Sequence, residues 1–358
     1  MDVGKATAGY EKWLRGYTPL IDVDLKKKHE AMRSGTFPFL RSTFYRWVQL
    51  FPKTCADIFD APRVLAVGDL HIENFGTWRD TEGRLIWGVN DFDEAAYMPY
   101  VNDLVRLATS ALLAIRTFHL AQSDDQCCDA ILDGYTEGLK QKGSPFVLEE
   151  KHEWLRGLAS GALRDPVAFW KKMELLPAAN DVPESAVVAI EHLLPPGTEY
   201  SLRSRVAGLG SLGHPRYVAI ADYLGGKVAR EAKALVPSST AWARDTDGVP
   251  EIFYQAIVDR SIRCADPYVK LEGHWIVRRL APDCSRVELN GTLDAAQGLK
   301  LLGAMGWETA NIHLGSPGAF DAVCKDLKRR SKSWLTKAAN AMADETGRDQ
   351  EAFGSLKQ

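Results

Sequence analysis

Two short segments of the sequence concentrate side chains that can handle protons, cations and phosphate groups. Asp69 and Asn74 lie on one loop after an apolar run at 63–67, and Asp91 and Asp93 follow a second apolar run at 84–89. A carboxylate at the start of such a loop can accept the proton of a hydroxyl group. An amide oxygen and a second carboxylate can hold Mg²⁺, a hard cation that prefers oxygen ligands and nucleotide phosphates. We predict Asp69, Asn74 and Asp91 as catalytic residues, and Asn74, Asp91 and Asp93 as metal ligands.

A glycine motif occurs much later in the chain. Gly208, Gly210 and Gly213 form the pattern GxGxxG, with Ser211 inside it. Backbone amides in such a turn can hold phosphates, either at the start of a Rossmann helix or within a β-hairpin. The alternating apolar run after 214–215 favours a second strand, and therefore the hairpin. We predict that these four residues bind a nucleotide, and a plain hairpin turn is the alternative.

These motifs carry a resemblance to known enzymes. Gly68–Asn74 resembles the catalytic loop of aminoglycoside phosphotransferases, choline kinases and related protein-kinase-like enzymes, and Asp91–Asp93 resembles the metal-binding motif that follows it. Asp103 resembles an aspartate that steadies this loop from the next helix. Most of the chain also resembles an uncharacterised bacterial family, domain-of-unknown-function family 2252, over 67–76, 90–95, 103–110 and 206–213. The likeness to the kinase-like enzymes implies a phosphotransferase that uses ATP and Mg²⁺.

The same likeness implies a cation on the third strand of the nucleotide lobe. Two residues fit: alignment on Arg-Glu-Ala favours Arg230, and alignment on Pro237-Ser238 favours Lys233. We keep both as nucleotide-binding candidates and prefer Lys233, because an ammonium is the usual choice in these enzymes. The helix expected next offers only Glu251 and Asp259 as weak carboxylate partners.

The elements that position these residues follow from periodicity and breaks. The sequence predicts strands at 63–67, 84–89 and 274–280, further strands within 203–235, and helices at 102–120, 250–264, 294–314 and 319–344. Prolines at 195–196 mark a boundary. The class expected is α+β. The resemblance implies a bilobal protein-kinase-like fold, circularly permuted because the catalytic loop precedes the glycine motif. We expect 1–200 and 286–358 to form the large lobe, 201–285 the small lobe, and a hinge near Leu280–Glu288.

Composition excludes several classes of protein. The chain has 358 residues, with 44 Lys and Arg against 47 Asp and Glu, which argues against a dedicated nucleic-acid or membrane-surface protein. The six cysteines form no metal-binding spacing, and we find neither a signal peptide nor a membrane span, so we expect a cytoplasmic protein with reduced thiols. The charged segment 24–30 is expected to be a solvated helix face.

These observations favour an ATP- and Mg²⁺-dependent transfer of the γ-phosphate to a hydroxyl group, with a small molecule as the expected acceptor. Two alternatives keep the fold: an adenylyltransferase that binds the nucleotide reversed, and a nucleotide-binding regulator. A metallophosphoesterase is less favoured, because its further histidine ligands are missing from the eight histidines present. The sequence does not determine the substrate or the oligomeric state.

Overall fold

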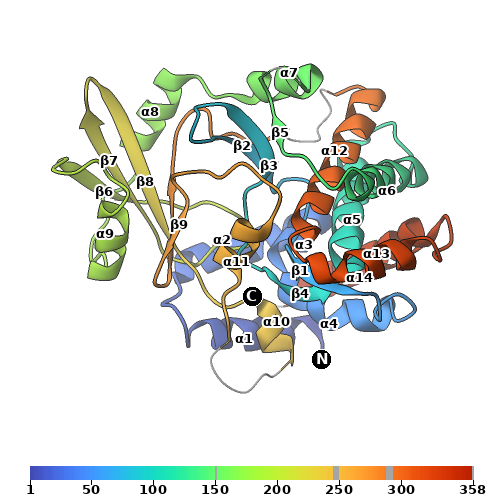
Figure 1. Cartoon of the computed structure of the whole chain (residues 1–358). Helices are drawn as coiled ribbons and strands as arrows, with labels where there is room; N and C mark the ends of the chain where they lie inside the picture. The colour runs from blue at the N-terminus through green and yellow to red at the C-terminus, as the bar shows by residue number, and fades with distance from the viewer. Residues whose placement is uncertain (150, 245–249, 288–292, 357–358) are drawn as a thin grey trace.

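The computed structural model describes residues 1–149, 151–244, 250–287 and 293–356. It combines helices with three small antiparallel sheets, so the mixed helix-and-sheet class predicted from the sequence is confirmed. The largest sheet lies at one side of the molecule and most of the helices lie at the other (Figure 1).

The largest sheet consists of five antiparallel strands. In spatial order they are β6 (Tyr200–Ser204), β7 (Arg216–Tyr223), β8 (Gly226–Ala234), β10 (Trp275–Arg279) and β9 (Lys270–Glu272). Side chains alternate between the faces of a sheet. Here helix α8 (Pro166–Glu174) packs on one face and α9 (Glu184–Glu191) on the other. The expected division at residue 200 therefore separates these two helices from the sheet that they cover.

Two smaller sheets carry the first motif. β1 (Arg63–Ala66) pairs with β4 (Ala96–Pro99), and β2 (Phe75–Arg79) pairs with β3 (Leu85–Val89), which also pairs with β5 (Phe146–Val147). The strands predicted at 63–67 and 84–89 are confirmed as β1 and β3, although they belong to different sheets. Because β1 pairs with β4 and β2 pairs with β3, the loop after β1 and the loop after β3 are brought together.

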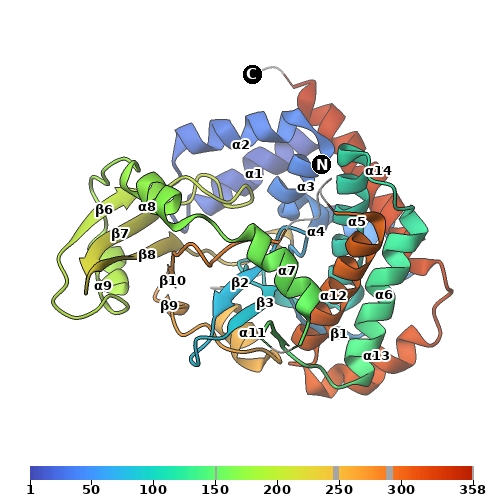
Figure 2. The ribbon, with the colours of Figure 1, turned by 90° about the horizontal axis from the view of Figure 1, so that it is seen from above.

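The helical side is built around α5 (Val101–Phe118), whose residues from 101 to 115 are all buried. It packs against α14 (Trp334–Gly354), while α6 (Asp124–Lys140) packs against α12 (Ala295–His313) (Figure 2). The predicted helices 102–120 and 294–314 are confirmed as α5 and α12. Further helices after α5 are α7 (Glu153–Ala162), α10 (Ser239–Arg244), α11 (Tyr254–Arg260), η1 (Pro317–Ala319) and α13 (Phe320–Leu327). The single helix expected at 319–344 is wrong, because residues 328–333 separate α13 from α14.

The N-terminal helices are α1 (Val3–Leu14), α2 (Asp22–Ser34), α3 (Thr36–Ser42) and α4 (Phe44–Thr54). The expectation that 24–30 forms a solvated face is wrong at Asp24 and Lys28, which are buried. Lys28 Nζ donates to the carbonyl oxygen of Gly210 at 2.7 Å. This end of the chain therefore holds the glycine motif in place.

Other expectations concern the whole chain. No helix among the described residues is long and apolar enough to cross a membrane. All six cysteines lie in the described part of the chain and are free thiols. The hinge predicted near Leu280–Glu288 extends beyond the described residues at Glu288. Within the described part, the backbone of Ser285 accepts a hydrogen bond from Thr77 N at 2.8 Å, so the connection after β10 is tied to β2.

Candidate functional site

One large cavity, of about 1230 Å³, brings together the two sequence motifs. Its walls include the loops after β1 and β3, the glycine motif, and residues of α2 to α4, α8 and β10. Seven of the ten predicted site residues line it, namely Asp69, Asn74, Asp91, Asp93, Gly208, Gly210 and Ser211, whereas Gly213, Arg230 and Lys233 do not. The structure therefore gathers residues that are about 140 positions apart in the sequence.

The loop after β1 is held by a buried carboxylate. Gly68 has a φ of +84°, and a Cβ atom there would lie 2.3 Å from the carbonyl oxygen of Glu94, so glycine is required. Asp103, the first-turn aspartate of α5, accepts hydrogen bonds from Val67 N at 2.7 Å and Gly68 N at 3.0 Å. Asp103 therefore holds the loop from the next helix, as the resemblance led us to expect.

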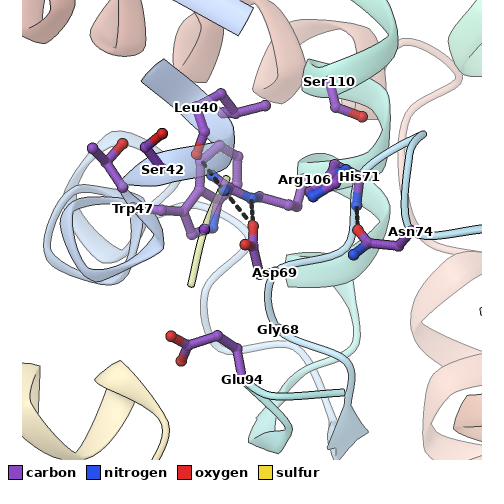
Figure 3. A network of polar contacts seen from close by, with 12 residues as sticks. Leu40, Ser42, Trp47, Gly68, Asp69, His71, Asn74, Glu94, Arg106 and Ser110 are labelled. Carbon is purple, nitrogen blue, oxygen red and sulfur yellow. Dashed lines mark hydrogen bonds and ion pairs between the residues drawn. The ribbon is translucent and has the colours of Figure 1, made fainter. Parts of the chain in front are cut away.

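Asp69, on this loop, lines the cavity, and Figure 3 shows its carboxylate beside Arg106. Its Oδ1 accepts hydrogen bonds from Arg106 Nε at 3.0 Å and Nη2 at 2.5 Å, and Arg106 also donates to the carbonyl oxygen of Leu40. The other oxygen, Oδ2, lies 3.7 Å from the position that a Cβ atom would take on Gly210. Burial raises the pKa of Asp69, although the neighbouring Arg106 opposes this rise. Arg106 therefore orients Asp69 and leaves Oδ2 toward the glycine motif.

Asn74 and His71 close the same loop. Asn74 Oδ1 accepts a hydrogen bond from His71 N at 2.7 Å, as Figure 3 shows. The His71 ring accepts from Glu73 N through Nδ1 at 3.2 Å, and burial followed by the charges of nearby arginines lowers the pKa of His71 well below its usual value. A neutral His71 that braces the loop agrees with this geometry.

Asp91 and Asp93 meet Lys233, which projects from β8. Lys233 Nζ lies 3.5 Å from Asp91 Oδ1 and forms a closer ion pair with Asp93 Oδ2. Burial opposes ionisation of Asp91, but the charges of Lys233 and Arg278 outweigh it and lower the pKa of Asp91. Burial and the negative charge of Asp91 raise the pKa of Asp93 above its usual value. The pair thus combines one firmly ionised carboxylate with one that holds a proton more tightly.

Glu94 belongs to the framework of the site. It accepts hydrogen bonds from Ser238 Oγ at 2.8 Å and from Ser239 N at 2.7 Å, and burial raises its pKa to about 7. These bonds fasten the loop after β3 to the segment after β8.

The glycine motif forms the connection between β6 and β7, as the hairpin prediction requires. Gly208 and Gly213 have φ angles of +75° and +97°. A Cβ atom on Gly213 would lie 2.7 Å from Leu25 of α2. Gly213 therefore anchors the turn against the N-terminal helices, whereas Gly208, Gly210 and Ser211 line the cavity.

Arg230 does not line the cavity, so the prediction that it binds the nucleotide needs correction. Arg230 donates to the carbonyl oxygen of Leu193 at 2.8 Å and lies over the ring of Tyr268. Because residues three apart on a strand point to opposite faces, Arg230 and Lys233 cannot both face the cavity. The geometry favours Lys233 as the cation of the site.

Sequence reasoning missed several charged residues of the cavity. Arg106 holds Asp69, and Arg41 pairs with Glu73 at 2.7 Å. Glu231 is buried with three arginines around it. No local signal marked Glu231, because charged residues also occur at positions 227, 230 and 233 of the same strand.

Comparison with known proteins supports only part of the predicted resemblance. Residues 21–156 match the model of a family described as an uncharacterized protein conserved in bacteria (DUF2252). The matched segment contains the loops after β1 and β3, whereas the glycine motif lies outside it. No curated protein and no solved structure matches the chain.

Proposed function

We propose that this protein is a phosphotransferase that moves the γ-phosphate of ATP to a hydroxyl group of a small molecule, with Mg²⁺ as cofactor. The observation that carries the proposal is the convergence of Asp69, the Asp91–Asp93 pair and the glycine motif on one cavity. Phosphoryl transfer depends on positioning and on neutralising charge, and these are the tasks that such residues can perform.

Asp69 is suited to accept the proton of the attacking hydroxyl group. Its Oδ1 is occupied by Arg106, which fixes the carboxylate in place, and its Oδ2 faces the glycine motif. The elevated pKa of Asp69 makes it a stronger base than an exposed aspartate. The acceptor hydroxyl would therefore lie within hydrogen-bonding distance of Oδ2, on the cavity side of Asp69.

The acidic residues suit a magnesium ion. Mg²⁺ is held by one or two carboxylates together with phosphate oxygens, and when bound it neutralises developing charge on the phosphates. Asp93 Oδ1 is buried without a hydrogen-bond partner, which leaves one oxygen available for a cation. Among the described residues no three His, Cys, Asp or Glu side chains form a group that could hold a metal ion, so Asn74 and the nucleotide would have to supply the further ligands. Asn74, Asp91 and Asp93 are the proposed ligands.

The glycine motif and Lys233 provide the nucleotide-binding part. In protein kinases a glycine-rich loop covers the phosphates and the lysine lies on the third strand. Lys233 lies on β8, the third strand of the sheet in chain order, and the glycine motif connects the first two. We therefore propose a bilobal kinase-like arrangement whose parts occur in circularly permuted order.

Two alternatives share this cavity. An adenylyltransferase would bind the nucleotide reversed, and a regulator would bind it without chemistry. A metallophosphoesterase is disfavoured because only His71 and His214 line the cavity among the described histidines.

The test uses ATP labelled at the α- or the γ-phosphate, incubated with the protein, Mg²⁺ and a bacterial small-molecule extract. We expect the γ-label, and not the α-label, in a new product, and we expect Asp69→Asn and Asp91→Asn to lose at least 100-fold in rate. Asp222→Asn is the matched control, because Asp222 is an exposed residue in the β7–β8 hairpin. Transfer of the α-label would replace the proposal with adenylylation. Unchanged transfer in both active-site variants would refute the residue assignment.

A further inference from the structure

The inward face of the five-stranded sheet carries a carboxylate surrounded by three arginines. Glu231 on β8 is completely buried. Arg278, its cross-strand partner on β10, donates to Glu231 Oε1 through Nε at 2.9 Å and pairs with it through Nη2 at 2.8 Å. Arg216 donates to the same oxygen at 3.2 Å, and Arg205 pairs with Oε2. We call Arg205, Arg216 and Arg278 the arginine group.

The arginine group lies beside the glycine motif. Arg205 directly follows β6 and Arg216 begins β7, so they mark the two ends of the connection that contains the motif. Arg216 Nη2 also donates to Ser211 Oγ at 2.5 Å. All three arginines line the cavity, whereas Glu231 lies beneath its surface. The carboxylate is thus placed to orient the guanidinium groups rather than to contact a ligand.

Positive charge exceeds negative charge around the arginine group. Its three arginines pair with one carboxylate, and the charges of Arg216 and Arg278 also act on Asp91. When Lys233 and its partners Asp91 and Asp93 are included, four cations meet three carboxylates, which leaves an excess of one positive charge. A further arginine, Arg164, also lines the cavity, and burial followed by the charges of Arg205, Arg286 and Arg278 lowers the pKa of Arg164. Gathering like charges costs free energy that a bound anion would offset.

The remaining hydrogen-bonding capacity of the group also indicates an anion. Arg216 is 4% exposed, and its Nε is buried without a hydrogen-bond partner. Guanidinium groups present several donors in a rigid fork that matches phosphate oxygens. The arginine group therefore offers directed donors and excess charge in one wall of the cavity.

We propose that Arg205, Arg216 and Arg278, oriented by Glu231, bind the polyphosphate chain of the ligand. The identification of that ligand as a nucleotide rests on the proposed function, whereas the affinity for polyphosphate does not. The arginine group then adds to the phosphate-binding part proposed for Lys233, which also pairs with Asp91 and Asp93. Glu231 is a positioning residue, because it acts through the arginines.

The test measures binding of inorganic tripolyphosphate to the full chain by calorimetry, without Mg²⁺ and at constant ionic strength, with chloride as the reference anion. We expect saturable binding that ATP displaces. Arg278→Met should weaken binding about 10- to 100-fold, since it removes a charge-assisted contact. Arg278→Lys keeps the charge but loses the fork, so it should lie between Arg278→Met and the unmodified protein. Glu231→Gln should also weaken binding, because the arginines lose their common partner.

Arg230→Met is the matched control, since Arg230 lies on the adjacent position of β8 and faces the other side of the sheet. It should bind tripolyphosphate as the unmodified protein does. The inference would be overturned if Arg278→Met and Arg205→Met both bound tripolyphosphate as tightly as the unmodified protein does. It would also be overturned if the unmodified protein did not bind tripolyphosphate. Asp69→Asn separates this inference from the proposed function: it should keep tripolyphosphate affinity and lose transfer. Phosphate transfer at the full rate in Arg278→Met would refute the proposed role of the arginine group and would leave the proposed function standing.

Discussion

Replacing Asp103 with alanine should destabilise the loop that carries Asp69 more than any other part of the protein. Asp103 is completely buried at the start of α5. Its two oxygens accept hydrogen bonds from Val67 N, Gly68 N and Asn102 Nδ2, and its Oδ2 lies 3.1 Å from His313 Nε2. The alanine variant leaves these donors buried without their acceptor.

The magnitude follows from the donors that cannot find another partner. The side chains of Asn102 and His313 have some freedom to adjust, but the backbone amides of Val67 and Gly68 are fixed by the loop. An orphaned buried donor costs about 1–3 kcal/mol, so two amides predict a loss of about 4 kcal/mol. In a chain of this size that corresponds to a decrease in Tm on the order of 5–10 °C.

The assay is urea unfolding followed by tryptophan fluorescence and circular dichroism, together with hydrogen exchange of the 67–74 segment. We expect the free energy of unfolding to fall by about 4 kcal/mol and the hydrogen exchange of the amides in 67–74 to accelerate. Asp124→Ala is the control, since Asp124 forms an exposed ion pair with Arg116 at 2.9 Å and should contribute less than about 1 kcal/mol. An Asp103→Ala protein within 1 kcal/mol of the unmodified protein, with unchanged exchange at 67–74, would refute the reasoning.

Two further predictions concern buried positions away from the cavity. Burial raises the pKa of Glu308 to about 7, from a value near 4.5 in the unfolded chain. Between about pH 4.5 and pH 7 the unfolded chain therefore releases a proton that the folded chain keeps. The free energy of unfolding falls over this range as the pH rises, by up to about 3 kcal/mol. Unfolding of Glu308→Gln from pH 4 to 8 should lack this component, and an identical pH profile would contradict the prediction. Gly134→Ala should cost at least about 2 kcal/mol, because its Cβ atom would lie 1.9 Å from the carbonyl oxygen of Gly303 and push α6 away from α12. Gly347→Ala has open space and should not destabilise the protein, so equal denaturation midpoints for the two variants would count against this packing.

The parts of the site that the sequence predicts correctly are those determined by local order. Asp69 and Asp91 each follow a short apolar strand, and local pattern is sufficient to place them at strand ends. The strand Phe75–Arg79 was not predicted, because four of its five residues are buried and no alternation is visible. The strand period alone indicates that Arg230 and Lys233 point to opposite faces, since the two positions differ by an odd number, but only the tertiary contacts identify Lys233 as the one beside Asp91 and Asp93.

The parts that sequence reasoning misses depend on pairing between distant strands. Arg278 meets Glu231 because β10 pairs directly with β8 in the sheet, although β9 and two helices separate them in the sequence. No local sequence pattern gives the register of that pairing. Lys28 illustrates a different limit. A charged run on a helix normally faces solvent, but here the tertiary contact with Gly210 overrides this preference.

The position of Lys233 explains why the acidic and basic parts of the site depend on each other. A buried ammonium without a partner costs several kcal/mol, and the partners of Lys233 come from the loop after β3, 140 residues earlier in the chain for Asp93. The two aspartates in turn place negative charges close together, and Lys233 offsets their repulsion. Removing either part leaves an uncompensated buried charge in the other, so the ion pairs hold the five-stranded sheet to the acidic loop. The arginine group lies on the same sheet but keeps its excess positive charge, and the net charge of −3 for the whole chain conceals this local separation.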